Sequence, residues 1–323
     1  NTELLSPAGD FECFQSALKF GADAIYLAGE EYGMRTSSAN FDHDTLKKAV
    51  SLAHEKGVAV YVTCNTTPRS KEMETLPSFL ESAADCGVDA FIVADLGVFS
   101  LAKKYAPNVE IHMSTQTGIV NYYTANVLHD MGAKRVVLAR ELSLDEIADI
   151  RAKTPKELEL EAFVHGSMCV SFSGRCLISS YMTGRDANRG DCAQPCRWKY
   201  HLYEQNREGQ YFPIEENENG TYLYNSRDLC MIEHIPDMID AGINSFKVEG
   251  RMKTALYVAV VTRTYREAID DYYTSKELYE SKMEHYREEI AACTFRQFTT
   301  GFYYGKPNEE TQIYDCNTYV KNR

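Results

Sequence analysis

The sequence predicts an α/β fold, a (β/α)8 barrel of the TIM type, because one kind of junction recurs along the chain. At each junction a helical segment ends in a glycine, and an apolar strand begins one or two residues later. Five such junctions occur, at Gly21, Gly57, Gly87, Gly132 and Gly242. No GxGxxG turn follows any of these strands, which favours the barrel over a doubly wound open sheet.

Eight apolar runs occupy the strand positions in order along the chain. They are ELLSPA, GADAIYLA, GVAVYVTC, GVDAFIVA, VEIHMS, GAKRVVLA, LELEAFVH and GINSFKVE. Segments between them, such as DTLKKAVSLAHEK and SLDEIADIRAK, carry apolar residues three and four positions apart and predict amphipathic helices. We therefore place the barrel at residues 1–273. Residues 274–323 are expected to form an extension that leads to a further carboxy-terminal β domain.

The composition is that of an ordinary globular protein, with 44% hydrophobic and 25% charged residues among 323. A net charge of −13 argues against a surface that binds polyanions everywhere. The first residues lack the pattern of a signal peptide, and no apolar run is long enough to cross a bilayer. We expect a cytoplasmic protein with no membrane span.

A long insertion, residues 166–229, separates the seventh and eighth predicted strands. Its second half, WKYHLYEQNREGQYFPIEENENGTYLYN, alternates apolar and polar residues around a glycine-containing turn, which predicts a β-hairpin. Loops that follow barrel strands lie on the face where barrel enzymes carry their active sites. The insertion is therefore expected to cover the barrel mouth.

Cysteines are concentrated in this insertion. Cys169, Cys176, Cys192 and Cys196 lie within a 28-residue stretch of it, and Cys230 is the first residue after the insertion. Disulfides are disfavoured in a cytoplasmic protein. Structural zinc sites prefer close pairs, a spacing that only Cys192 and Cys196 offer, whereas iron–sulfur ligands are thiolates at more varied spacings. An iron–sulfur cluster is the favoured interpretation, with zinc as the alternative.

Polar residues stand where several predicted strands end, at the expected active face. His112 and His165 suit proton transfer because imidazole titrates near neutral pH, and Gln116 and Glu161 are further catalytic candidates. Three cations at strand ends suit a small dicarboxylate: Arg140, Lys247 and Arg251. No HExxH, GxSxG or Walker motif is present, so a hydrolase would need an unconventional site.

The insertion is also basic, in contrast to the acidic chain around it. Between residues 175 and 199 five cations face two carboxylates; the cations are Arg175, Arg185, Arg189, Arg197 and Lys199. These cations either balance the charge of thiolates and a cluster or bind carboxylates or RNA phosphates. Arg185 and Arg189 are the candidates for RNA, and Trp198 or a nearby tyrosine is available to stack on a base.

The stretch EAFVHGSMCVSFSGRCLISSY closely resembles the signature of the collagenase-like peptidase family U32. Further matching stretches are LLSPAGD, GADAIYLAG, HMSTQ, RELSL, NRGDCAQPCRW, NSRDLC and FKVEGRMK, so the resemblance covers nearly the whole chain. The family combines a barrel with a smaller β domain. Some members are called peptidases, and other branches resemble oxygen-independent hydroxylases that carry a [4Fe-4S] cluster.

The resemblance implies cluster ligands at Cys169, Cys176, Cys192 and Cys230, with Cys196 as the rival fourth ligand. Among the hydroxylase branches, the one that modifies the tRNA wobble uridine with prephenate is the most similar. We expect an RNA hydroxylase of that type, with tRNA and a small dicarboxylate as its partners. A U32 peptidase and a non-catalytic maturation or binding protein are the alternatives.

Overall fold

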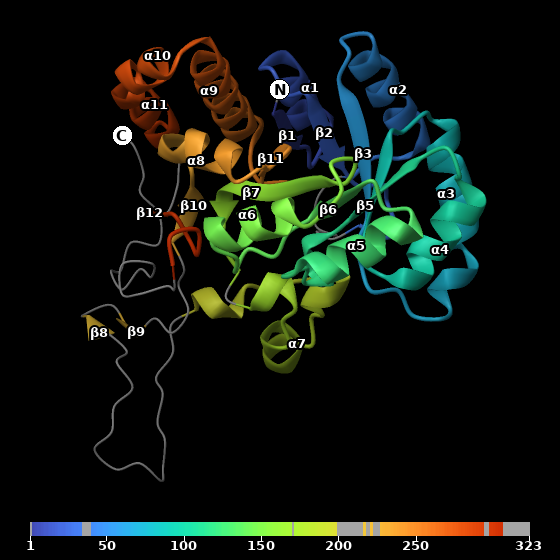
Figure 1. Cartoon of the computed structure of the whole chain (residues 1–323). Coiled ribbons are helices and arrows are strands. Elements are labelled where there is room, and N and C mark those ends of the chain that lie inside the picture. Colours follow the sequence, from blue (N-terminus) through green and yellow to red (C-terminus); the bar gives the residue numbers. More distant parts are fainter. Residues whose placement is uncertain are drawn as a thin grey trace, which may run out of the picture.

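The computed structural model describes residues 2–33, 40–169, 171–198, 216–217, 220–221, 227–293 and 297–305. Its centre is a closed barrel of eight parallel strands (Figure 1). The strands are β1 (Glu3–Pro7), β2 (Ala24–Leu27), β3 (Ala59–Cys64), β4 (Ala90–Val93), β5 (Glu110–Met113), β6 (Arg135–Val137), β7 (Glu159–Ser167) and β11 (Ser245–Val248). Strand β11 pairs with both β1 and β7 and so closes the barrel. The predicted (β/α)8 barrel and all eight of its strands are confirmed.

Helices surround the barrel and cover its outer face (Figure 1). They are α1 (Phe11–Lys19), α2 (His43–His54), α3 (Leu76–Asp85), α4 (Leu96–Tyr105), α5 (Tyr122–Met131), α6 (Leu144–Ala152), α8 (Ile235–Asp240) and α9 (Ala255–Thr274). Short polar side chains begin several of them; Ser143, for example, forms a reciprocal capping box with Glu146. The five junction glycines all have positive φ, between 71° and 110°, as the sequence pattern predicted.

The insertion lies between β7 and β11, as predicted. Its described part holds the 3-10 turns η3 (Phe172–Gly174), η4 (Ala187–Arg189) and η5 (Pro195–Arg197), the helix α7 (Ile178–Thr183), and the strands β8 (Glu216–Asn217), β9 (Gly220–Thr221) and β10 (Asp228–Cys230). β8 and β9 pair antiparallel within the predicted hairpin, most of which lies outside the described residues. β10 adds an antiparallel edge to β7, a strand that the sequence did not predict.

Two short helices follow the barrel, α10 (Lys276–Ser281) and α11 (Met283–Ala291), and both pack against α9. Tyr279 is buried there and donates a hydrogen bond of 2.7 Å to the carbonyl of Ile232, ahead of α8. Residues 276–291 thus form a further layer of helices on the outside of α9 (Figure 1). The boundary expected at residue 273 falls in the last turn of α9.

The barrel interior differs from the apolar layer between strands and helices. The outer layer is a large apolar core, whereas the apolar residues inside the barrel form a small cluster around Leu5, Tyr26, Tyr61 and Ile92. Charged side chains share this interior space with them, as described below. The interior therefore offers a polar floor to whatever lies at the barrel mouth.

Candidate active site

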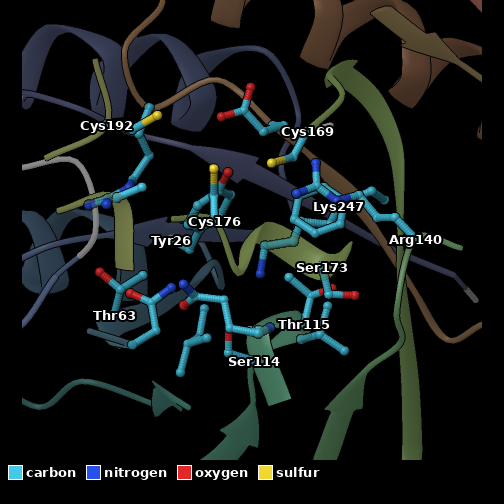
Figure 2. A pocket seen from close by; sticks show the side chains of 18 of the residues that line it. Tyr26, Thr63, Ser114, Thr115, Arg140, Cys169, Ser173, Cys176, Cys192 and Lys247 are labelled. Atoms are coloured by element: carbon cyan, nitrogen blue, oxygen red, sulfur yellow. Dashed lines mark hydrogen bonds between the residues drawn. The ribbon is translucent and has the colours of Figure 1, made fainter. Parts of the chain in front are cut away.

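A pocket of about 150 Å³ lies at the carboxyl ends of the barrel strands, beneath the insertion (Figure 2). The barrel supplies Tyr26, Thr63, Asn65, Ile92, Ser114, Thr115, Gln116, Val137, Arg140, Phe163, Lys247, Glu249 and Arg251. The insertion supplies Cys169, Ser173, Cys176, Ala187, Cys192, Pro195 and Cys196. The first part of the insertion therefore covers the barrel mouth, as predicted.

Four thiols of the insertion line this pocket, those of Cys169, Cys176, Cys192 and Cys196. The first three lie along one side of it, opposite the floor that includes Thr63 and Ser114 (Figure 2). No group of three or more His, Cys, Asp or Glu side chains within the described ranges is arranged to hold a metal ion. A metal would require the thiols to move closer together, and the donors at hand would then be sulfur atoms, which suit iron–sulfur clusters and zinc.

Hydrogen bonds to the barrel hold the insertion over the pocket. Ser173 donates through its backbone N and its Oγ to the Glu141 carboxylate, at 2.6 and 2.8 Å. Arg175 donates from Nε to the carbonyl of Gln116 at 2.7 Å. The side chain of Asn188 accepts from the backbone N of Cys176 and donates to its carbonyl, at 3.3 and 3.0 Å. These contacts fix Cys176 in particular.

Two glycines bring the strand ends together beneath the insertion. Gly166, at the end of β7, has φ +112°, and a Cβ on it would lie 2.6 Å from the carbonyl oxygen of Glu249. Gly9 packs even more closely, since a Cβ on it would lie 1.8 Å from the carbonyl oxygen of Arg251. Only glycine permits both approaches. They place Glu249 and Arg251 in the pocket lining.

The three cations predicted to bind a small anion, Arg140, Lys247 and Arg251, all line the pocket. Arg140 donates to the carbonyl of Ser167 at 3.2 Å and lies over the Phe163 ring, 4.9 Å from its centroid. Lys247 donates from Nζ to Glu161 at 2.6 Å. The structure therefore brings these cations to one pocket.

Glu161, predicted as catalytic, lies fully buried one layer below the pocket and does not line it. It accepts from Lys247 and from Arg135, the latter at 3.1 Å, and Arg135 also pairs with Glu3 and Glu159. Burial raises the pKa of the Glu161 carboxyl, but the two cations outweigh burial and hold that pKa below its usual range. Glu161 is therefore an ionised support for Lys247.

The two histidines predicted to transfer protons do not reach the pocket. His112 is buried one layer lower, where its ring lies edge-on to Tyr61, and burial lowers its pKa. His165 points toward α9, beside Tyr257 and Tyr265, and burial lowers its pKa to about 3. His165 faces outward because β7 has a bulge. Phe163 pairs with Lys247 and His165 with Val248, so Val164 is an extra residue that reverses the side to which the next side chain points.

Gln116, the remaining catalytic candidate, does line the pocket. Its buried Oε1 has no hydrogen-bond partner in the part of the chain that the structure describes, and the same holds for Thr63 Oγ1 in the pocket floor. Sequence reasoning missed Thr63 and Tyr26. A polar residue near the end of an apolar strand, as in AVYVTC, was the available signal.

Cys230 does not line the pocket. It lies on β10 opposite His165, with its Sγ 3.9 Å from the Tyr265 hydroxyl, and burial raises its pKa to about 11. Cys230, which the resemblance implies as a ligand, therefore lies apart from the other three candidates, because β10 pairs with the end of β7. Cys196 lines the pocket instead.

The basic residues of the insertion pair largely with carboxylates of the same chain. Arg185 donates to Asp191 at 2.7 Å, and Arg189 forms a two-point pair with Glu72, whose pKa it lowers to about 2. Lys199 and the side chain of Arg197 lie outside the described residues. Two cations of the insertion are thus balanced by carboxylates of this chain, Asp191 and Glu72.

Comparison with known proteins gives the family. The model of peptidase family U32 matches residues 9–313. The chain belongs to the U32 family. The U32 relatives include tRNA hydroxylation protein P1 of Bacillus subtilis, 40% identical over 97% of this chain and 73% of the relative.

Two further U32 relatives carry different names. An uncharacterized protease of Methanocaldococcus jannaschii is 42% identical over 95% of this chain and 74% of its own length. The 23S rRNA 5-hydroxycytidine C2501 synthase of Escherichia coli is 34% identical over 98% of this chain and 47% of its own length. Similarity of this kind therefore links the chain to proteins named for RNA hydroxylation and to one named as a protease.

Proposed function

We propose that this protein is an RNA hydroxylase that acts on the wobble uridine of tRNA, with an iron–sulfur cluster as cofactor and prephenate as the source of the hydroxyl group. The observation that carries the proposal is the pairing of four thiols with three cations around one pocket, in a chain whose relatives are named for hydroxylation of tRNA and rRNA.

The thiols supply the donor chemistry for the cofactor. Cys169, Cys176 and Cys192 would hold a [4Fe-4S] cluster together with either Cys230 or Cys196. When bound there, such a cluster supplies one-electron redox chemistry next to the pocket. Of the two candidates for the fourth ligand, Cys196 lines the pocket, whereas Cys230 matches the ligand pattern implied by the family signature.

The cations supply a binding site for a dicarboxylate. Lys247 is held in the pocket floor by the buried Glu161 carboxylate, so its ammonium group has a fixed position and a balanced charge. Among the described residues Arg140 donates one hydrogen bond, to Ser167, so most of its guanidinium donors face no other described acceptor. Arg251 joins them in the lining, and planar guanidinium groups suit carboxylates. Gln116 offers a buried amide next to these cations.

A peptidase is supported only by the names of the family and of some relatives. Cysteine and serine peptidases need an imidazole within hydrogen-bond reach of the nucleophile. In the described part of the chain, neither His112, inside the barrel, nor His165, which faces α9, lines the pocket that holds the thiols and Ser114. The geometry therefore favours the hydroxylase.

The experiment is complementation of a strain that lacks this protein, with the modified nucleosides of its tRNA measured by mass spectrometry. Wild-type protein should restore 5-hydroxyuridine-type nucleosides, and Lys247→Met should abolish that restoration. Lys276→Met, which alters an exposed lysine on α10, is the matched control and should behave as wild type. Wild-type protein that restores no hydroxylated nucleoside would refute the proposal.

A further inference from the structure

A second hollow, a groove of about 1140 Å³, opens beside the thiol-lined pocket. One wall is α5 and the start of α4, and the other is the insertion around Arg175, Leu177 and Asn188. The groove and the pocket share three lining residues, Asn65, Gln116 and Cys176, so the two spaces adjoin. Figure 1 shows α5 close to the insertion that carries α7.

The two spaces differ in what they can hold. The pocket is smaller than the ~300–1,000 Å³ that encloses a whole drug-sized ligand, so it has room for a small group such as a base or a dicarboxylate. The groove is larger than that range and open to solvent. A ligand that places one base in the pocket would extend its chain along the groove.

The groove wall carries several large apolar side chains that are exposed to solvent. Tyr123 on α5 is 70% exposed, and Leu96, Val127 and Leu177 are each more than half exposed. Tyr123 also stacks on Tyr122, with ring centroids 4.5 Å apart and an angle of 30° between the rings. A neighbouring ring restrains Tyr123 and leaves one of its faces open for an aromatic ligand.

The charges of the lining favour an anionic ligand in this acidic protein. Three arginines line the groove together with the carboxylates Asp95 and Asp186. Arg189 is already paired with Glu72, so Arg69 and Arg175 are the cations that the groove offers to a ligand. Asp95 accepts from the backbone N of Gly97 and Val98 at the start of α4, and Asp186 accepts from the backbone N of Asn188. Both carboxylates are thus partly balanced by backbone amides.

Two buried polar atoms of the lining point to a ligand as well. Gln116 Oε1 and Thr117 Oγ1 have no hydrogen-bond partner within the described ranges of the chain. Polar atoms that are buried without a partner are rare in native proteins. A donor on a bound molecule would satisfy them at the junction of groove and pocket.

We propose that this groove binds the nucleotide next to the modified base in a single-stranded RNA loop, with its base stacked on Tyr123 and its phosphate near Arg69 and Arg175. The inference rests on the proposed function and assigns it an RNA-binding surface. Single-stranded RNA is read by stacking of splayed bases on aromatic rings together with phosphate contacts. This surface keeps Arg175 and Arg189 of the basic segment expected from the sequence, whereas Arg185 pairs with Asp191 and Trp198 lines neither hollow.

The test measures binding of a tRNA anticodon stem-loop to the full-length protein by fluorescence anisotropy, beside the nucleoside assay described above. Tyr123→Ala should weaken binding by about 5- to 100-fold, the range seen when a stacking aromatic is removed. Tyr123→Phe keeps the ring and should bind within about twofold of wild type. Tyr181→Ala is the matched control, because Tyr181 is 90% exposed on α7 and lines neither hollow.

A second variant reports the phosphate contact. Arg69→Gln should lower the slope of log affinity against log salt by about 0.7, the value for one single-strand phosphate. Equal affinity of Tyr123→Ala and wild type, in a wild-type protein that does modify RNA, would overturn the groove assignment alone. Wild-type protein that neither binds the stem-loop nor restores the nucleoside would overturn the proposed function and this inference with it.

Discussion

Single residues in the barrel interior determine how the pocket presents its charges. Glu161 is the main example, because its carboxylate is fully buried and accepts from Lys247 on one side and Arg135 on the other. A buried charge that loses its partner is far more costly than an exposed one. The position of Lys247 in the pocket therefore depends on a residue that no ligand touches.

Replacing Glu161 by Gln should destabilise the protein strongly. The change keeps the shape of the side chain but leaves Lys247 without a buried counter-charge, and the expected loss is about 3–5 kcal/mol of unfolding free energy, measured by urea denaturation. Glu289→Gln removes a surface partner of Arg263 and should cost about 0–1 kcal/mol. Similar losses for both variants would contradict the role given to Glu161.

His112 should contribute to the loss of stability in acid. Burial lowers the pKa of its imidazole from the ordinary value of 6.5. The unfolded chain takes up this proton as pH falls below about 6.5, and the folded protein does not until the pH is lower. The unfolded state then binds more protons, so this group lowers stability as pH falls, by at most about 1.4 kcal/mol per pH unit.

The measurement is the dependence of unfolding free energy on pH between pH 7 and pH 5, in urea titrations. His112→Gln should give a shallower slope than wild type over this range. A slope that His112→Gln does not alter would show that this imidazole is not kept neutral by the fold.

At the scale of elements, the junction between β7 and the insertion determines where the site lies. Gly166 ends the barrel part of β7, the bulge at Val164 turns His165 outward, and β10 then pairs along the outer edge. Three neighbouring features therefore decide which side chains of this segment face the pocket and which face α9.

Gly166→Ala should disturb this junction more than a glycine change elsewhere. A Cβ at Gly166 adds an unfavourable φ and a 2.6 Å contact with the Glu249 carbonyl, so we expect a loss of more than about 2 kcal/mol in unfolding free energy. Gly57→Ala is the matched control, since its φ is +71° and nothing lies within 4 Å of its Cβ. It should cost about 1–2 kcal/mol.

The cysteines of the insertion give a prediction about metal content. Protein purified without oxygen should contain about four iron and four sulfide ions per chain, the content of a cubane cluster. Cys176→Ala should lower both, whereas Cys64→Ala, a change at a cysteine buried in β3, should leave both unchanged. A colourless protein with one zinc per chain would contradict the cluster.

The fourth ligand is decided by comparing two variants in the same assay. The family signature predicts that Cys230→Ala lowers iron and sulfide and that Cys196→Ala does not. The position of Cys196 in the pocket lining predicts the opposite: Cys196→Ala lowers iron and sulfide, and Cys230→Ala does not. Whichever variant retains its iron excludes the altered cysteine as a ligand.

At the scale of the whole molecule, the barrel could be predicted from the sequence because its signal is repeated. The same junction of helix end, glycine and apolar strand recurs along the chain. Each copy therefore strengthens the assignment of the other strands. The antiparallel strand β10 could not be predicted, because three residues, Asp228–Cys230, carry no periodicity and gain their structure only by pairing with β7.

The site was predictable to the extent that side chains follow the strand ends. Arg140, Gln116 and Lys247 were placed correctly in the pocket because they lie at or after regular strands. His165 was misplaced because a bulge changes the alternation by one residue, and the sequence gives no sign of it. The second hollow was missed because its walls, α5 and the insertion, are separate segments that only the fold brings together.

The late position of β11 has a consequence for the order of synthesis. A ribosome releases the chain from its amino end, so Cys169 to Cys196 emerge before residues 245–248 exist. At that moment the chain lacks the strand that pairs with both β1 and β7, so the barrel cannot be closed and Lys247 is not yet part of it. A cluster of the kind proposed above would therefore meet its thiol ligands before the barrel can close. The pocket is complete only when this last strand has paired with β1 and β7.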